Sequence, residues 1–162
     1  MTKWGIAVTV ILSAVVLQSA VLPIHIASPF KPDLLLIFVV YLALRGSFQA
    51  GAPLSWTLGL VKDVFSGLYL GLNALSFLFI FMVIKSISDR LYTESAPLFV
   101  ITVSVATLSC VSLNLLLLVM FTASPGIVYS MGVGLVPHLL VNAFAASLIP
   151  LLPGFDRLLE TS

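Results

Sequence analysis

Long apolar runs separated by short polar clusters dominate the sequence, and their positions predict its secondary structure. A helix needs about 20 apolar residues to cross the hydrocarbon core of a bilayer. The apolar runs predict six spans, at about residues 4–22, 33–45, 51–63, 67–85, 97–121 and 128–151. The expected fold class is an all-α integral membrane protein, a six-transmembrane-helix bundle that forms a single transmembrane domain over residues 1–162.

The position of Arg45 decides how the middle of the chain is divided. A single helix over residues 34–61 would place this arginine deep in lipid, at a cost of about 2.5–3.5 kcal/mol or more. Gly46, Gly51 and Pro53 favour a break close to Arg45. We therefore predict two short or tilted helices joined by a turn, with Arg45 as a topology anchor.

Lysine and arginine near the span ends predict the orientation. With the N-terminus inside, the cytoplasmic basic residues are Lys3, Arg45, Lys85, Arg90 and Arg157. Lys31 and Lys62 fall on the other side, so we expect both termini in the cytoplasm. The loop that holds Lys85, Asp89 and Arg90 is either a solvated turn or a contact for a soluble partner.

Composition supports a surface that faces lipid. Hydrophobic residues make up 60% of the chain, charged residues 8%, and the mean hydropathy is +1.22, whereas soluble domains carry about 25% charged residues. The net charge of +1 provides no basic field for nucleic acid. The single cysteine, Cys110, lies in an apolar run and can form neither an intrachain disulfide nor a cysteine-based metal site.

The most informative segment runs from residue 59 to 75, Gly59-Leu-Val-Lys62-Asp63-Val-Phe-Ser66-Gly67-Leu-Tyr69-Leu-Gly71-Leu-Asn73-Ala-Leu. Two adjacent opposite charges lie between apolar runs here, and ionisable residues near membrane depth are candidates for function. Adjacent helical residues point about 100° apart, so the two charges can face different partners. Two glycines have the GxxxG spacing that lets helices approach closely. We predict a partner or packing interface at Gly59, Lys62, Asp63, Gly67, Gly71 and Asn73; the alternative is an interfacial charge pair beside glycines that only pack.

Asn114 and His138 lie at similar distances on either side of the turn at Pro125. Given a rise of about 1.5 Å per residue, they sit within about one helical turn of each other in depth. Asn142 follows His138 by one turn on the same face. We expect interhelical hydrogen bonds among these three residues across the fifth and sixth spans, each contributing about 0.6–2 kcal/mol. The alternative is a transport or proton-relay role for His138.

Catalytic signatures are missing from the sequence. It contains no H-E-x-x-H, no G-x-S-x-G and no P-loop. Its six acidic residues are too few and too scattered for a two-metal lipid transferase. We therefore expect no enzymatic activity, no cofactor and no metal.

Three stretches carry a family likeness: Pro32-Asp33-Leu-Leu-Leu before an apolar helix, the glycine-rich residues 46–59, and the pattern G-L-x-x-D…G…L-G-L-N-A over residues 59–74. Together they resemble the rod shape-determining protein MreD family. The likeness in length and span spacing covers essentially the whole chain. It implies a non-catalytic inner-membrane subunit of the bacterial elongation complex, which maintains rod shape by assembling or regulating MreC, MreB and the RodA–PBP2 peptidoglycan synthase.

The resemblance also implies a helical bundle similar to the substrate-binding subunits of energy-coupling factor transporters. A small-molecule-binding membrane transporter subunit is therefore the alternative function. Ala7, Ala14 and Ala20 do not form the A-x-x-x-A coupling pattern of those subunits, which weakens this alternative. The sequence leaves the oligomeric state open, with a homodimer among the options.

Overall fold

A computed structural model of the chain describes residues 30–66, 70–88, 96–121 and 125–149, together with Ser13, Val15 and Gln18. In this part of the chain the elements are helices: α3 (Leu34–Arg45), α4 (Phe48–Ser66), α5 (Leu72–Ser88), α6 (Ala96–Phe121) and α7 (Pro125–Leu148). The expected all-α class is confirmed for the described residues. The span expected at about 4–22 lies outside them, apart from the three single residues.

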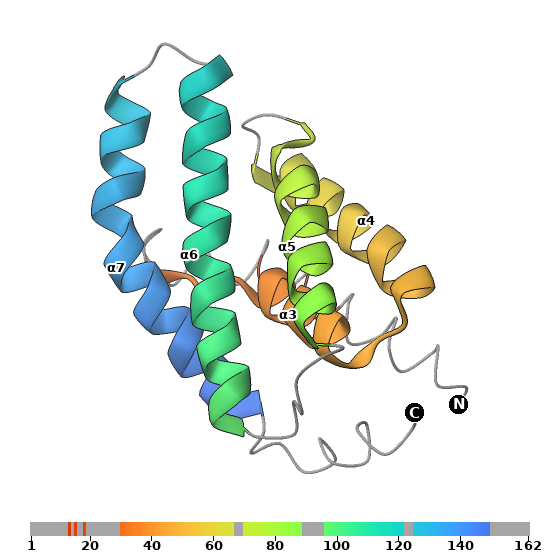
Figure 1. Cartoon of the computed structure of the whole chain (residues 1–162). Coiled ribbons are helices and arrows are strands. Elements are labelled where there is room, and N and C mark those ends of the chain that lie inside the picture. The colour runs from red at the N-terminus through yellow and green to blue at the C-terminus, as the bar shows by residue number, and fades with distance from the viewer. Residues whose placement is uncertain are drawn as a thin grey trace.

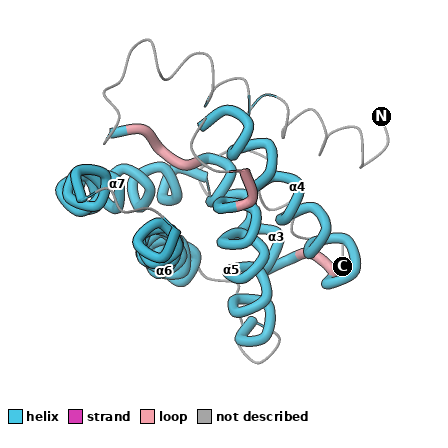
Figure 2. Tube along the Cα trace, turned by 90° about the horizontal axis from the view of Figure 1, so that it is seen from above, coloured by secondary structure: helices cyan, strands magenta, loops and turns pink. Residues whose placement is uncertain are grey.

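The helices form two pairs around a short central helix (Figure 1). Helices α4 and α5 lie side by side, as do α6 and α7, and the two helices of each pair are antiparallel. Helix α3 contacts both pairs. The view from above also places α6 beside α7 and keeps α3 close to α4 and α5 (Figure 2). The start of α3 consequently lies where the two pairs face each other.

Helix α3 is apolar nearly all round, and this explains its central place. Its buried side chains are Leu35, Leu36, Ile37, Val39, Val40 and Ala43. Phe77 and Phe81 of α5, both fully buried, belong to the same core cluster. Because no polar stripe would face water, burial among other helices is the favourable position for such a segment.

The break after Arg45 is shorter than the sequence suggests. Helix α3 ends at Arg45 and α4 begins at Phe48. The amide of Gly46 closes α3 by donating to the carbonyl of Leu42 over 2.7 Å. Gly51 and Pro53, which we expected at the break, lie inside α4 instead. A proline near a helix start removes one backbone hydrogen bond and the helix continues.

The remaining helix ends differ from expectation by several residues in places. Helix α4 continues to Ser66, and α5 begins only at Leu72, so Gly71 precedes the helix. Helix α6 matches the predicted range of 97–121 within one residue, and α7 is shifted toward the N-terminus relative to 128–151.

Within the described residues, one segment is long and apolar enough by itself to cross a membrane. It is Pro97–Met120 of α6, with 24 residues and a mean hydropathy of 2.2. Shorter apolar helices are Leu34–Arg45, Leu72–Ser88 and Val133–Leu148. Large apolar side chains are exposed on the outer faces of α6 and α7, among them Ile101, Val105, Leu116, Val119, Val133, Val136, Leu140 and Phe144. Contiguous exposed apolar surface of this kind suits lipid or a membrane partner.

Candidate functional site

A partly buried ion pair joins the start of α3 to the last turns of α4. The ammonium of Lys62 donates to Oδ2 of Asp33, and the two side chains are 21% and 3% exposed. The same ammonium lies 4.9 Å from the ring centroid of Phe77, which adds a cation–π attraction. Buried charges lose their hydration, so such a pair depends on further hydrogen bonds around it.

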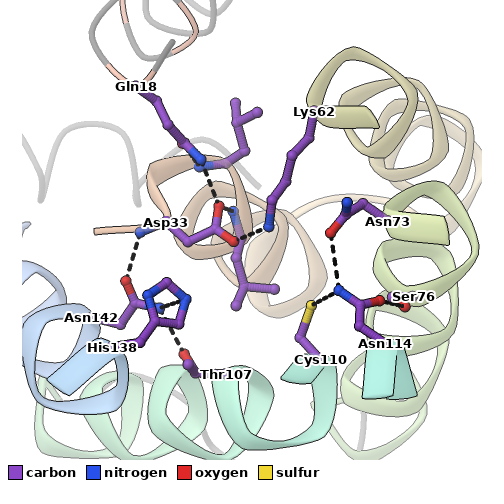
Figure 3. A network of polar contacts seen from close by, with 12 residues as sticks. Gln18, Asp33, Lys62, Asn73, Ser76, Thr107, Cys110, Asn114, His138 and Asn142 are labelled. Atoms are coloured by element: carbon purple, nitrogen blue, oxygen red, sulfur yellow. Dashed lines mark hydrogen bonds and ion pairs between the residues drawn. The ribbon is translucent and has the colours of Figure 1, made fainter. Parts of the chain in front are cut away.

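Asp33 receives those further bonds from the N-terminal part of the chain (Figure 3) and from the first turn of its own helix. Its Oδ1 accepts from Nε2 of Gln18 over 3.1 Å and from the amide of Leu36 over 3.2 Å. Gln18 in turn accepts from the amide of Leu35 over 3.1 Å. Asp33 therefore caps α3 and links it to the N-terminal part of the chain.

Neither Asp33 nor Gln18 was among the predicted site residues. The signal for Asp33 was available, because an aspartate directly before an apolar run is typical of a helix N-cap. Its pairing with Lys62 spans 29 residues and depends on tertiary packing, which the sequence pattern does not reveal.

Asn142 of α7 connects three parts of the molecule. Its Oδ1 accepts from the amide of Asp33 over 2.6 Å, and its Nδ2 donates to Oγ1 of Thr107 over 3.1 Å. The same Nδ2 lies 3.5 Å from Nε2 of His138. A fully buried asparagine therefore joins α7 to α6 and to the start of α3.

The contacts of His138 define its tautomer. Its Nδ1 lies 3.1 Å from the carbonyl oxygen of Lys31, which can only accept, so Nδ1 carries the proton. Its Nε2 faces the donor amide of Asn142 and accepts. Both ring nitrogens of a neutral histidine are thus used within the chain.

Asp63, adjacent to Lys62, faces a different helix. Its carboxylate accepts from the amides of Gly71 (2.9 Å), Asn73 (2.9 Å) and Ala74 (3.2 Å). It also accepts from Nδ2 of Asn73 over 2.8 Å. The first amides of a helix lack intrahelical acceptors and carry a partial positive charge. Asp63, only 3% exposed, therefore caps α5 from α4.

Asn114 links α6 to α5. Its Nδ2 donates to Oδ1 of Asn73 over 3.1 Å, and its Oδ1 accepts from Ser76 over 2.5 Å. The amide also lies 3.9 Å from the sulfur of Cys110, a buried residue one turn earlier. We expected Asn114 to bond toward α7, and the structure pairs it with α5 instead. Similar depth does not bring two side chains together, because rotation about the helix axis decides the neighbour that a side chain meets.

The glycines of the informative segment have separate local roles. A Cβ at Gly59 would come within 2.6 Å of the Ala74 nitrogen and 2.7 Å of the Asn73 carbonyl oxygen, so Gly59 lets α4 and α5 meet backbone to backbone. Gly71 has φ of 99° in the turn before α5, and a Cβ there would meet no atom within 4 Å.

Gly67 lies outside the described residues, as do Asp89 and Arg90, while Lys85 lies in the last turn of α5.

A cleft of about 720 Å³ opens beside the ion pair. Its polar lining comes from the residue directly before α3 and from helices α4, α5, α6 and α7. The polar lining residues are Asp33, Lys62, Ser66, Asn73, Thr107, Cys110, Asn114 and His138. Figure 3 shows these groups, apart from Ser66, converging from different elements on one interior region. In the part of the chain that the structure describes, no cluster of three His, Cys, Asp or Glu residues suited to a metal occurs.

The described helices enclose paired charges and amides, and α6 is long and apolar enough to cross a membrane, so they fit a helical membrane protein with a polar core. Comparison with known proteins makes the assignment more specific. The sequence model of the rod shape-determining protein MreD family matches residues 1–160, and the chain belongs to this family. Neither the curated proteins nor the solved structures gave a match.

Proposed function

We propose that the chain is a non-catalytic subunit of the bacterial elongation complex in the inner membrane. It would maintain rod shape by assembling or regulating MreC, MreB and the RodA–PBP2 peptidoglycan synthase. The observation that carries this proposal is the family match over residues 1–160. The interior supports assembly, because its charged and amide groups bond to one another and fix the helix packing, while large apolar faces remain exposed.

The membrane arrangement that we propose has six spans and cytoplasmic termini. The excess of lysine and arginine on one side supports it, as do the antiparallel pairs α4–α5 and α6–α7. In this arrangement the start of α3 and the end of α4 lie toward the periplasmic side. A span of 12 residues such as α3 is about 18 Å long, so it needs neighbours or local thinning of the bilayer.

Two regions are proposed for partner contact. One is the end of α4 around Gly67, where Val64 and Phe65 are 66% and 61% exposed. A membrane partner is expected there. The other is the cytoplasmic loop with Lys85, Asp89 and Arg90, expected to meet a soluble partner. Leucine at Gly67 should reduce recovery of MreC at unchanged chain level, while alanine at the same position should reduce it less.

Depletion in a rod-shaped host, combined with affinity recovery, tests the function. We expect depleted cells to become round, and a tagged chain to recover MreC from detergent-solubilised membranes. A second polytopic inner-membrane protein with the same tag serves as the control. Cells that stay rod-shaped on depletion, together with a tagged chain that recovers no more MreC than this control, would contradict the proposal.

The cleft beside Lys62 supports a second candidate, a small-molecule-binding subunit of a transporter. Its volume of about 720 Å³ is within the usual range for ligand sites. This candidate requires an uptake defect on deletion and an ATPase among the recovered partners. A deletion strain with normal uptake of the tested nutrients and no ATPase in the recovered material would remove it.

A further inference from the structure

The cleft between the two helix pairs has walls that are mainly apolar. Its volume of about 720 Å³ admits a small organic molecule. The apolar lining includes Phe30, Leu36, Leu72, Val111, Val133 and Leu135. Since these residues come from several helices, the cleft is a product of the tertiary arrangement and not of one helix face.

Most polar groups of the lining are already occupied. The amides of Asn73 and Asn114, the hydroxyl of Thr107 and the ring of His138 bond to the partners described above. Among the described residues, no buried side-chain nitrogen or oxygen is without a hydrogen-bond partner. These groups would have to give up existing bonds to bind a ligand.

Lys62 is different from the other polar groups of the cleft. An ammonium has three N–H donors, and of the described residues only Asp33 accepts a hydrogen bond from it. The Lys62 side chain is 21% exposed, whereas that of Asp33 is 3% exposed. The cleft therefore offers a donor, and a bound molecule would present an acceptor oxygen to it.

The balance of charge favours an uncharged ligand. The charge of Lys62 is matched by Asp33, and the carboxylate of Asp63 is satisfied by the start of α5. An anion would place a further negative charge near two carboxylates with no added cation among the lining residues, and an unpaired buried charge is costly. A carbonyl, ester or hydroxyl oxygen accepts from Lys62 without that cost.

We propose that the cleft binds an uncharged lipid from the bilayer, with an ester, carbonyl or hydroxyl oxygen on Lys62 and its apolar chain along α6 and α7. Val133, which is 63% exposed and lines the cleft, lies where the cleft meets the outer apolar face of α7. The lipid can enter at this edge. The inference goes beyond the assembly function and depends only on the chain lying in a membrane.

A photoreactive diacylglycerol tests the site in the purified full chain, reconstituted in phosphatidylcholine nanodiscs. The competitors are dioctanoylglycerol and the anionic dioctanoyl phosphatidic acid, which share their acyl chains. We expect labelling of residues 107–114 and 133–138 that dioctanoylglycerol removes at about tenfold lower concentration than phosphatidic acid does. Labelling that neither competitor reduces, or that phosphatidic acid reduces as well or better, would overturn the proposal.

A matched pair of valines on α7 locates the site. Val133 and Val136 are 63% and 61% exposed, and only Val133 lines the cleft. Val133→Trp should reduce the competable labelling about tenfold, and Val136→Trp should leave it unchanged. An equal effect of the two substitutions would show that the label reports general contact with lipid, and the proposal would fail.

A pair of double variants tests the role of Lys62 as a donor. Asp33→Asn with Lys62→Gln removes both charges and keeps an N–H donor at position 62, whereas Asp33→Asn with Lys62→Met removes that donor; the amide introduced at position 33 is common to both variants. Competable labelling should be about tenfold lower in the methionine variant than in the glutamine variant. Equal labelling would exclude the hydrogen bond from Lys62. Recovery of MreC is measured separately, so a failure of lipid binding is distinguishable from a failure of the proposed assembly function.

Discussion

Asp33 accepts hydrogen bonds from three segments, at Gln18, Leu36 and Lys62. Each bond offsets part of the cost of removing a carboxylate from water. From sequence, Asp33 is recognisable as the start of a helix, and Lys62 as an unusual charge near membrane depth. Their contact was not predictable, since the sequence gives no rotation or position of α4 relative to α3.

Removing one member of this ion pair should cost more than removing both charges. Lys62→Met leaves the Asp33 charge without its cation, and we expect a loss of about 3–5 kcal/mol in the free energy of unfolding. The double variant with Asp33→Asn should recover a large part of that loss. Reversible thermal or denaturant unfolding in detergent measures both. Equal losses in the single and double variants would contradict the pairing.

Asp63 should stabilise the first turn of α5 specifically. Asp63→Ala removes the acceptor for three backbone amides, and we expect a cost of about 2 kcal/mol. Hydrogen exchange should become faster at the amides of Gly71, Asn73 and Ala74. Ser66→Ala, which removes only a hydroxyl bond to the Asp63 carbonyl, is the control and should leave these amides protected. Unchanged exchange in Asp63→Ala would show that the carboxylate does not cap the helix.

At the level of the elements, the apolar runs of the sequence predict that the described helices exist, but they do not predict all of the helix ends. Helix α6 is uninterrupted by charge, and its ends were predicted within one residue. The end of α4 and the start of α5 were not, because Asp63 caps α5 from outside and moves its start to Leu72. Gly51 was misread as a break, since a helical glycine that packs against an aromatic ring looks the same in sequence as one in a turn.

The contact between α4 and α5 should be sensitive to one added methyl group. Gly59→Ala would bring a Cβ against the backbone of Asn73 and Ala74, which cannot move alone, and we expect a loss of about 1–3 kcal/mol. Gly51→Ala meets only the ring of Phe81, which can shift, so its loss should be smaller. Both variants gain similar helix propensity. Unfolding measurements that rank Gly51→Ala as the more damaging variant would contradict the backbone contact.

On the scale of the whole molecule, the polar residues of several helices gather in one interior region (Figure 3). Asn114, His138 and Asn142 could be singled out from sequence because they interrupt long apolar runs. The contacts that these three side chains make were predictable only in part. Asn142 reaches α6 and the start of α3, while Asn114 reaches α5. The count of lysine and arginine near the span ends predicts the orientation in the membrane, with both termini in the cytoplasm.

Reporter fusions test that orientation. Alkaline phosphatase is active only outside the cytoplasm, so a fusion after residue 123 should be active and one after residue 93 inactive. The expected activities differ by at least about tenfold, since the positive-inside distribution favours one orientation. The reverse pattern, or equal activity at the two sites, would refute the proposed topology.

The bond between the amide of Asp33 and Asn142 joins residues 109 positions apart. If the chain is made at about 5–20 residues per second, the first partner waits on the order of 5–20 s for the second. In the proposed six-span arrangement, the early helices thus enter the bilayer while the centre of the protein is still incomplete. The centre is completed only when α7 packs against the other helices. A truncated chain that ends before α7 would therefore leave the polar interior exposed, and membrane quality control can recognise such a chain.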